Sequence, residues 1–260
     1  MIELLRTLAE FGADEAIEEK PINRYKQKPK PQTEDNTSPA VSLKRAVKPI
    51  QSPSNTAMET LEQAKSCDTR EKLKETIESF KGISITKTAT NTVFCDGQPD
   101  AEIMLIGEAP GAEEDARGIP FCGASGQLLD KMLIHIGLSR EKNFYITNTL
   151  FWRPPGNRRP TPEEINICRP FVEKHIALIN PKLIILVGGT AVTSVLNNNQ
   201  TITKIRGQFF DYTNQFLDGT IKTTAIFHPS YLLRSPGQKK SAWHDCLTIR
   251  KHIRENSIKI

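Results

Sequence analysis

At residues 103–111 the chain reads IMLIGEAPG, an apolar run that ends in a Gly/Pro turn carrying the carboxylate Glu108. Three further acids, Glu113, Glu114 and Asp115, follow closely. An apolar run of this kind predicts a buried strand, and α/β proteins place ligand sites at the carboxyl ends of such strands. The stretch therefore predicts a sheet and a site at its edge.

Three more apolar runs end on residues that could contact a ligand. Residues 143–147 lead into Asn148, residues 183–187 into Gly188 and residues 223–227 into His228. Helical patterns separate the runs, and a hairpin-like excursion precedes the last one. Short apolar strands separated by helices predict a parallel sheet covered on both faces. We expect the four strand ends to lie along one rim.

The helix signals support this arrangement. Apolar residues at helical spacing occupy 128–136 and are followed by Gly137, a typical helix stop. Residues 161–164 read TPEE, a capping box with proline at the first helical position. Residues 57–81 predict helix, with a cap signal at 68–71.

Composition sets the outer bounds. The chain has 260 residues and 37% hydrophobic content, enough for one substantial core. Its apolar runs are far shorter than the roughly 20 residues of a membrane span, so no membrane partner is expected. Residues 1–20 predict an amphipathic helix containing acids rather than a signal peptide. Five separated cysteines without an export signal predict a cytoplasmic protein without disulfides.

Residues 21–56 differ in composition from the rest. They hold seven Lys/Arg against Glu34 and Asp35, together with six of the 17 prolines. This pattern predicts a disordered basic linker between the helix at 1–20 and a folded domain at 57–260. The linker is either a solubilising spacer or a nucleic-acid tether.

Seven motifs resemble, in order and spacing, those of the family 4 uracil-DNA glycosylases. They are GEAPG (107–111), ED (114–115), GxPFxG (118–123), GQLL (126–129), ITN (146–148), RPPxNR (153–158) and HPSYLLR (228–234). The resemblance implies a three-layer α/β/α sandwich around a four-stranded parallel sheet. It also implies that residues 57–260 are a catalytic domain, monomeric, that hydrolyses the N-glycosidic bond of uracil in DNA and starts base-excision repair.

The chemistry of such an enzyme suggests a role for each motif residue. Phe121 would stack on the flipped base, and the Asn148 amide would donate to uracil O4 and accept from N3–H. His228 would donate to O2 as negative charge develops there. Alone, each has a plainer interpretation as a loop anchor, a turn former or a structural histidine.

The acidic turn would supply the remaining groups. Glu108 would orient or activate water and offset positive charge on the sugar, with Asp115 and Glu114 as supporting acids. Ala109 would line the uracil site. The alternative is a solvated acidic turn at a helix N-terminus.

Residues 230–240 resemble the DNA-inserting loop of the family. Leu232 and Leu233 would enter the base stack beside Tyr231, while the cations Arg234, Lys239 and Lys240 would hold phosphates. The alternative is a helix start that buries both leucines.

The chain departs from the family at its [4Fe–4S] cluster. The family pattern has a Cys-x-x-Cys pair before the first strand, a third cysteine where this chain has Trp152, and a fourth at Cys168. No Cys-x-x-Cys pair exists here, so Cys168 is the only matched ligand and no metal or cofactor is expected. Cys168 would then be a packing residue, and Trp152 would fill the volume of the cluster.

Two other functions are also compatible with the sequence. One is a DNA-binding relative that has lost catalysis. The other is a metal-dependent nuclease or phosphatase that uses the acids near Glu108.

Overall fold

The computed structural model describes residues 55–197 and 200–260. Within these ranges the apolar run after residue 102 forms strand β2 (Ile103–Gly107), in which all five residues are buried. The helix expected at residues 1–20 and nearly all of the linker expected at 21–56 lie outside the described residues.

The described residues form the following elements in chain order. They are α2 (Asn55–Lys65), α3 (Arg70–Ser79), η2 (Ser84–Lys87), β1 (Asp96–Gly97), β2, α4 (Ala112–Arg117), α5 (Ala124–Ile134), β3 (Tyr145–Asn148), η3 (Pro155–Asn157), α6 (Pro162–Ile179), β4 (Leu183–Val187), α7 (Gly189–Leu196), α8 (Ile202–Ile205), β5 (Phe209–Tyr212), β6 (Ile221–Ile226), α9 (Pro229–Arg234), η4 (Pro236–Gln238) and α10 (Lys239–Glu255).

The sheet has six strands in the order β1-β3-β2-β4-β6-β5. Its four central strands are parallel, as the alternation of apolar runs and helices predicted. The expected total of four strands is wrong, because β1 and β5 add antiparallel edges. β1 has only two residues, and β5 belongs to the hairpin that precedes β6 and is only partly buried. Neither therefore has the apolar signature of a central strand.

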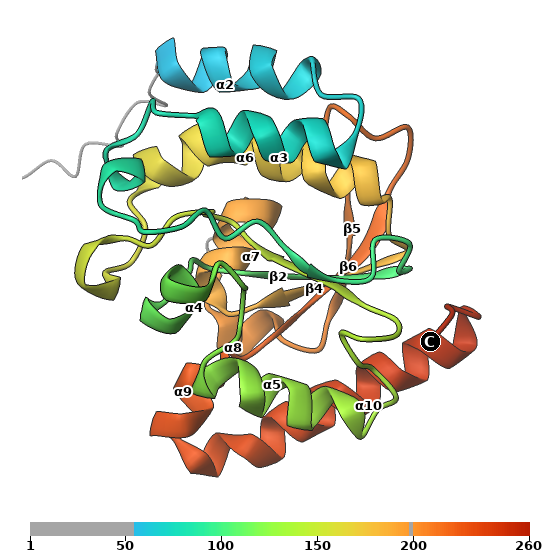
Figure 1. Ribbon diagram of the computed structural model, residues 1–260. Helices are drawn as coiled ribbons and strands as arrows, with labels where there is room; N and C mark the ends of the chain where they lie inside the picture. Colours follow the sequence, from blue (N-terminus) through green and yellow to red (C-terminus); the bar gives the residue numbers. More distant parts are fainter. Residues whose placement is uncertain (1–54, 198–199) are drawn as a thin grey trace, which may run out of the picture. The chain divides into compact units, whose positions relative to one another are not determined.

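Helices cover both faces of this sheet (Figure 1). Side chains alternate along β2: Met104 and Ile106 pack into the core beneath α6, whereas Ile103 and Leu105 pack into the core lined by α5 and α10. Burial on both faces is typical of a parallel sheet between two helix layers. The predicted three-layer α/β/α sandwich is therefore confirmed.

Two predicted helix starts are also present. Thr69 caps α3 by accepting a hydrogen bond from Lys72 N at 3.1 Å. Thr161 caps α6 and forms a capping box with Glu164, with bonds of 3.2 and 2.8 Å. Each cap satisfies a backbone N–H that the first helical turn leaves without a partner. Among the described helices, none combines the length and the apolarity that a membrane span requires.

A buried histidine joins α6 to the sheet. The Nε2 atom of His175 lies 2.8 Å from the Tyr145 hydroxyl, and its ring stacks on Phe94 with centroids 4.4 Å apart. The His175 side chain is fully buried, and this burial lowers its pKa to about 3. The folded protein therefore keeps His175 neutral under conditions in which an unfolded chain protonates it.

This difference predicts a loss of stability in mild acid. Above about pH 6.5 both states hold a neutral ring, but as the pH falls toward 3 only the unfolded chain binds the proton. As the pH falls from 6.5 to 5.0, protonation of His175 in the unfolded chain should lower the free energy of unfolding by about 2 kcal/mol, at about 1.4 kcal/mol per pH unit. Urea unfolding at pH 7.0 and 5.0 measures this loss. The loss should be smaller in His175→Gln. In the control His244→Gln, a substitution at an exposed position on α10, it should be the same as in the wild type. An unchanged pH dependence in His175→Gln would contradict the assignment.

Candidate active site

The carboxyl ends of the parallel strands bring the predicted residues together. The strand register pairs Gly107, the last residue of β2, with Asn148, the last residue of β3. β4 and β6 end side by side, and Gly188 and His228 lie just beyond them. Gly188 has a φ of +98°, and a Cβ atom there would lie 3.0 Å from the Cβ of His228. A glycine at this position therefore lets the chain turn close to His228.

Gly107 contacts an amide and an aromatic ring at once. A Cβ atom on Gly107 would lie 2.4 Å from Asn148 Oδ1 and 2.4 Å from Phe121 Cζ. Only bare backbone fits between these two groups. Asn148 is 2% exposed, and its amide group forms no hydrogen bond to another described residue. Phe121 is nearly buried and lies 5.8 Å from the His228 ring, centroid to centroid.

The helix that follows His228 fixes the orientation of its ring. Ser230 N donates to His228 Nδ1 at 3.2 Å, and Ser230 Oγ lies 2.8 Å from the same nitrogen. Because a backbone N–H can only donate, Nδ1 accepts, and the neutral ring carries its proton on Nε2. Burial lowers the pKa of His228, an effect that the nearby Glu108 carboxylate partly opposes. His228 is therefore a neutral hydrogen-bond donor at neutral pH.

Glu108 is anchored through its backbone. Its carbonyl accepts hydrogen bonds from Thr149 Oγ1 at 2.6 Å and from Leu150 N at 3.1 Å. Its side chain is half-buried at the rim. Ala109, which follows, is also half-buried and packs against the core cluster beneath α6. The segment that follows β3 thus holds the turn that carries Glu108 and Ala109.

The two supporting acids have structural contacts instead. Asp115 is buried, and its Oδ1 accepts from Thr90 N at 2.8 Å and from Asn91 N at 3.2 Å. Glu114 accepts from Gly111 N at 3.1 Å and from Gly123 N at 3.0 Å. The catalytic supporting role of Asp115 stays a prediction, because backbone amides of another loop occupy its Oδ1 atom and Arg153 Nη1 lies 4.0 Å from its Oδ2 atom. Both acids instead fasten loops to the start of α4.

The predicted DNA-inserting loop is helical and divides its two leucines. Leu232 is fully buried in a small core with Phe227 and Ala242, so the prediction that it inserts into DNA is wrong. Leu233 is 45% exposed. Adjacent residues of a helix point about 100° apart, so α9 can bury one leucine and expose the next.

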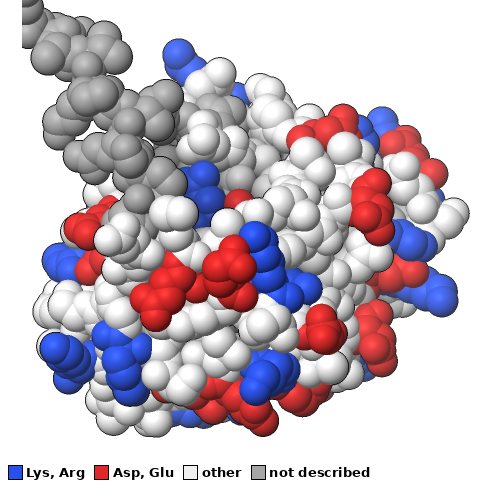
Figure 2. Space-filling view, turned by 90° about the horizontal axis from the view of Figure 1, so that it is seen from above, with Lys and Arg blue, Asp and Glu red and all other residues white. Residues whose placement is uncertain are grey.

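Other residues of this region lie at the surface. Arg234, Lys239 and Lys240 are exposed, and the half-buried Tyr231 packs on Phe227 with ring centroids 5.1 Å apart. The outer surface of the α2 and α3 layer is different, because Lys/Arg and Asp/Glu alternate across it (Figure 2). Ion pairs Lys65–Glu62, Lys72–Glu75 and Lys74–Glu78 run along these two helices. The exposed cations near α9 are thus the better candidates for contacts with a polyanion.

The residues at the expected cluster position do not fit an iron–sulfur cluster. Trp152 and Cys168 are buried in one apolar core with Phe80, whose ring lies 5.9 Å from Trp152 and 5.5 Å from Phe171. Burial raises the pKa of the Cys168 thiol, which disfavours the thiolate that iron requires. Among residues 55–197 and 200–260, no group of three or more His, Cys, Asp or Glu is placed to hold a metal ion.

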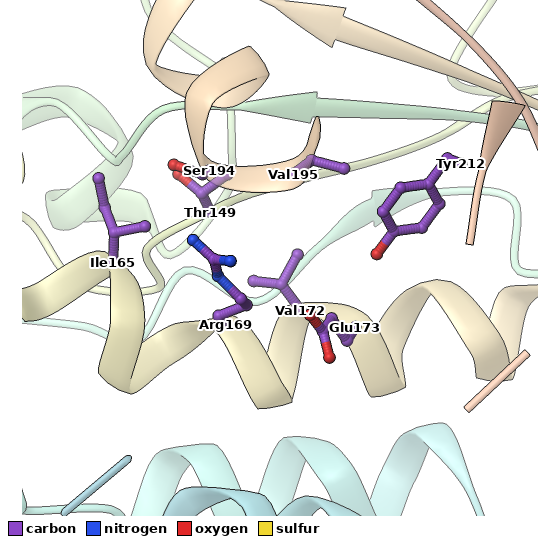
Figure 3. A pocket seen from close by; sticks show the side chains of 8 residues that line it. All are labelled: Thr149, Ile165, Arg169, Val172, Glu173, Ser194, Val195 and Tyr212. Carbon is purple, nitrogen blue, oxygen red and sulfur yellow. The ribbon is translucent and has the colours of Figure 1, made fainter. Parts of the chain in front are cut away.

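A small, partly open cavity lies between α6, α7 and β5 (Figure 3). Figure 3 shows Arg169 extending from α6 toward Ser194 and Thr149. The cavity measures about 10 Å³, room for about one water molecule. It is too small for a base, so the strand ends remain the candidate site. Its contact with the site runs through Thr149, which also holds the Glu108 carbonyl.

Comparison with known proteins agrees with this geometry. The family model for the uracil DNA glycosylase superfamily matches residues 94–247. A type-4 uracil-DNA glycosylase of Sulfurisphaera tokodaii is 38% identical over 189 residues, which cover 71% of this chain and 84% of the relative. The chain belongs to the type-4 uracil-DNA glycosylase family.

Two further type-4 uracil-DNA glycosylases are similarly related. The protein of Archaeoglobus fulgidus is 40% identical over 62% of this chain and 81% of its own length. That of Thermotoga maritima is 43% identical over 56% of this chain and 73% of its own length. The region that the superfamily model matches, residues 94–247, includes the four strand ends.

One residue beside the Phe121 loop, Arg140, was not indicated by the sequence. Arg140, in the turn between α5 and β3, donates to the carbonyls of Pro120 and Phe121. A lone arginine in a turn has no periodicity or spacing that would indicate its contacts, so no signal in a single sequence could have found it.

Proposed function

We propose that this protein removes uracil from DNA by hydrolysing the N-glycosidic bond of a flipped nucleotide. The observation that carries the proposal is the contact of Gly107 with both the Asn148 amide and the Phe121 ring. An amide that reads a base edge and a ring that stacks on its face are what recognition of a flipped base requires. Membership of the type-4 family supports the choice of uracil.

Each group then has a chemical role. Asn148 donates to uracil O4 and accepts from N3–H, a pattern that cytosine reverses. As the N1–C1′ bond breaks, the electron pair leaves with uracil, and the Nε2–H of His228 donates to O2 of the resulting anion. Glu108 offsets the positive charge on the sugar and orients the water that adds to C1′, accepting its proton. The products are an abasic site and free uracil, because the uracil anion takes up a proton from solvent while Glu108 releases to solvent the proton that it accepted from water.

The surrounding surface supports DNA binding near α9. Leu233 would enter the duplex stack, Arg234, Lys239 and Lys240 would contact phosphates, and Tyr231 would support the helix from the side of Phe227. We further propose that residues 57–260 are the catalytic domain and act as a monomer, because one chain supplies every group of the reaction. We also propose that the protein is cytoplasmic, since its five cysteines are free thiols.

A metal-dependent nuclease or phosphatase is not favoured. Such an enzyme needs carboxylates free to bind a cation. Of the acids near Glu108, Glu114 and Asp115 accept hydrogen bonds from backbone amides. Two of these acids therefore anchor loops, Glu113 is exposed on α4, and Glu108 remains as the half-buried acid at the strand ends.

Uracil release tests the function directly. Wild-type protein in EDTA should release free uracil from a uracil-containing oligonucleotide and leave an alkali-labile abasic site. Glu108→Gln and His228→Ala should each lower the single-turnover rate by about 10²-fold or more, the scale for losing one preorganised group. Glu113→Gln, at an exposed acid of α4, is the matched control and should keep the wild-type rate. Loss of activity in EDTA that Mg²⁺ restores would contradict the proposal.

The two leucines of α9 should behave differently. Leu233→Ala should slow excision from duplex DNA more than from single strands, since only a duplex needs a residue to replace the lost stacking. Leu232→Ala should instead lower the unfolding free energy by about 2–5 kcal/mol, with similar rates on both substrates at a temperature where it is folded. Equal losses on both substrates for Leu233→Ala would exclude its insertion.

We also infer that the protein folds without an iron–sulfur cluster. It should purify colourless under anaerobic conditions, without broad absorbance near about 400 nm and without stoichiometric iron. Cys168→Ala should keep the activity, because Cys168 serves packing in the Trp152 core. A brown protein with about four irons per chain, bleached by Cys168→Ala, would overturn this inference.

A further inference from the structure

Arg140 uses its whole guanidinium group to join three parts of the structure. Its side chain is 18% exposed. Nε and Nη2 donate to Asp130 Oδ1 at 3.2 and 2.9 Å, and Nη1 donates to Asp96 Oδ2 at 2.8 Å. Nη1 also donates to the Pro120 carbonyl and Nη2 to the Phe121 carbonyl, each at 3.1 Å. The five N–H donors of arginine therefore match five hydrogen bonds.

The two carbonyls belong to a loop with unusual backbone geometry. Phe121 has a φ of +52°, a left-handed conformation that residues other than glycine rarely adopt. Such a conformation persists only where the surroundings hold it. Helix α5 provides one support, because a Cβ atom on Gly126 would lie 1.7 Å from the Phe121 oxygen. The Phe121 carbonyl thus lies against bare helix backbone on one side and receives Arg140 on another.

The same backbone determines where the Phe121 ring lies. The ring contacts Gly107 and faces His228 only while the loop keeps this geometry. Asp96 comes from the edge strand β1 and Asp130 from α5, so the guanidinium ties the loop to two elements of the sandwich. Burial alone would lower the pKa of Arg140, but the hydrogen bonds to Asp96 and Asp130 raise it above its ordinary value. Arg140 is therefore a permanent cation that cannot release the loop by losing a proton.

We propose that Arg140 is a positioning residue that holds Phe121 in its left-handed conformation, so that the ring is ready to stack on the flipped base. This proposal rests on the proposed function, and it adds a residue that does not itself contact the base. Lysine cannot replace arginine here, because a single ammonium cannot span two carbonyls and two carboxylates.

A double-mutant cycle between Arg140 and Phe121 tests this role. Single-turnover uracil excision is measured for wild type, Arg140→Lys, Phe121→Ala and the double variant, at a temperature where urea unfolding shows all four folded. Arg140→Lys alone should slow excision by about 10-fold or more and weaken inhibition by free uracil, since small displacements of a positioning group are costly. In the Phe121→Ala background the same change should cost less than about 3-fold, because the ring it positions is gone.

Arg206→Lys is the matched control. Arg206 is similarly buried, donates to Asp245 and to the Ser241 carbonyl on α10, and lies over the Phe227 ring, and none of these contacts involves the Phe121 loop. Its effect should be the same with and without Phe121. If Arg140→Lys is equally costly in both backgrounds, Arg140 does not act through the Phe121 ring and the inference fails. If wild-type protein releases no uracil while free uracil still binds in an Arg140-dependent way, the proposed function fails and the positioning role stands.

Discussion

The parallel register that sets Gly107 opposite Asn148 is the constraint on which the site depends. Side chains alternate along a strand, so a slip of one residue would turn Asn148 to the opposite face of the sheet. The register is secured by the apolar residues on both faces of β2, each of which fits only one of the two cores. The hydrophobic alternation that builds the sandwich therefore also positions the Asn148 amide, which we propose reads the base.

The site also depends on how its loops are anchored. Phe121 of the proposed site lies on a loop, and charged side chains hold backbone amides and carbonyls in and beside that loop. Glu114 joins the turns at Gly111 and Gly123, and Arg140 holds the Phe121 carbonyl. Charge-assisted hydrogen bonds of this kind are stronger than neutral ones. In our proposal they hold Phe121 in its left-handed conformation, so that the base site is formed before substrate arrives.

The sequence predicted the features that depend on repeating patterns. The four parallel strands, the rim formed by their ends and the caps at Thr69 and Thr161 follow from apolar runs and local cap chemistry. The edge strands escaped because β1 is too short for a pattern and β5 is only partly buried. Leu232 and Leu233 could not be told apart, since their exposure depends on how α9 is rotated against Phe227. Acids such as Asp115 looked reactive because a sequence does not reveal which backbone amides face a carboxylate.

The bare backbone of Gly107 lets the Asn148 amide and the Phe121 ring lie where we propose that they contact the base. Substituting this glycine by alanine, with Gly219→Ala as a control at a position where a Cβ would meet nothing within 4 Å, tests it most directly. The dissociation constant of free uracil should rise by about 10-fold or more in Gly107→Ala, because the new methyl group displaces the amide, the ring or both. Gly219→Ala should bind uracil as wild type does. Unchanged uracil affinity in a folded Gly107→Ala protein would contradict the account.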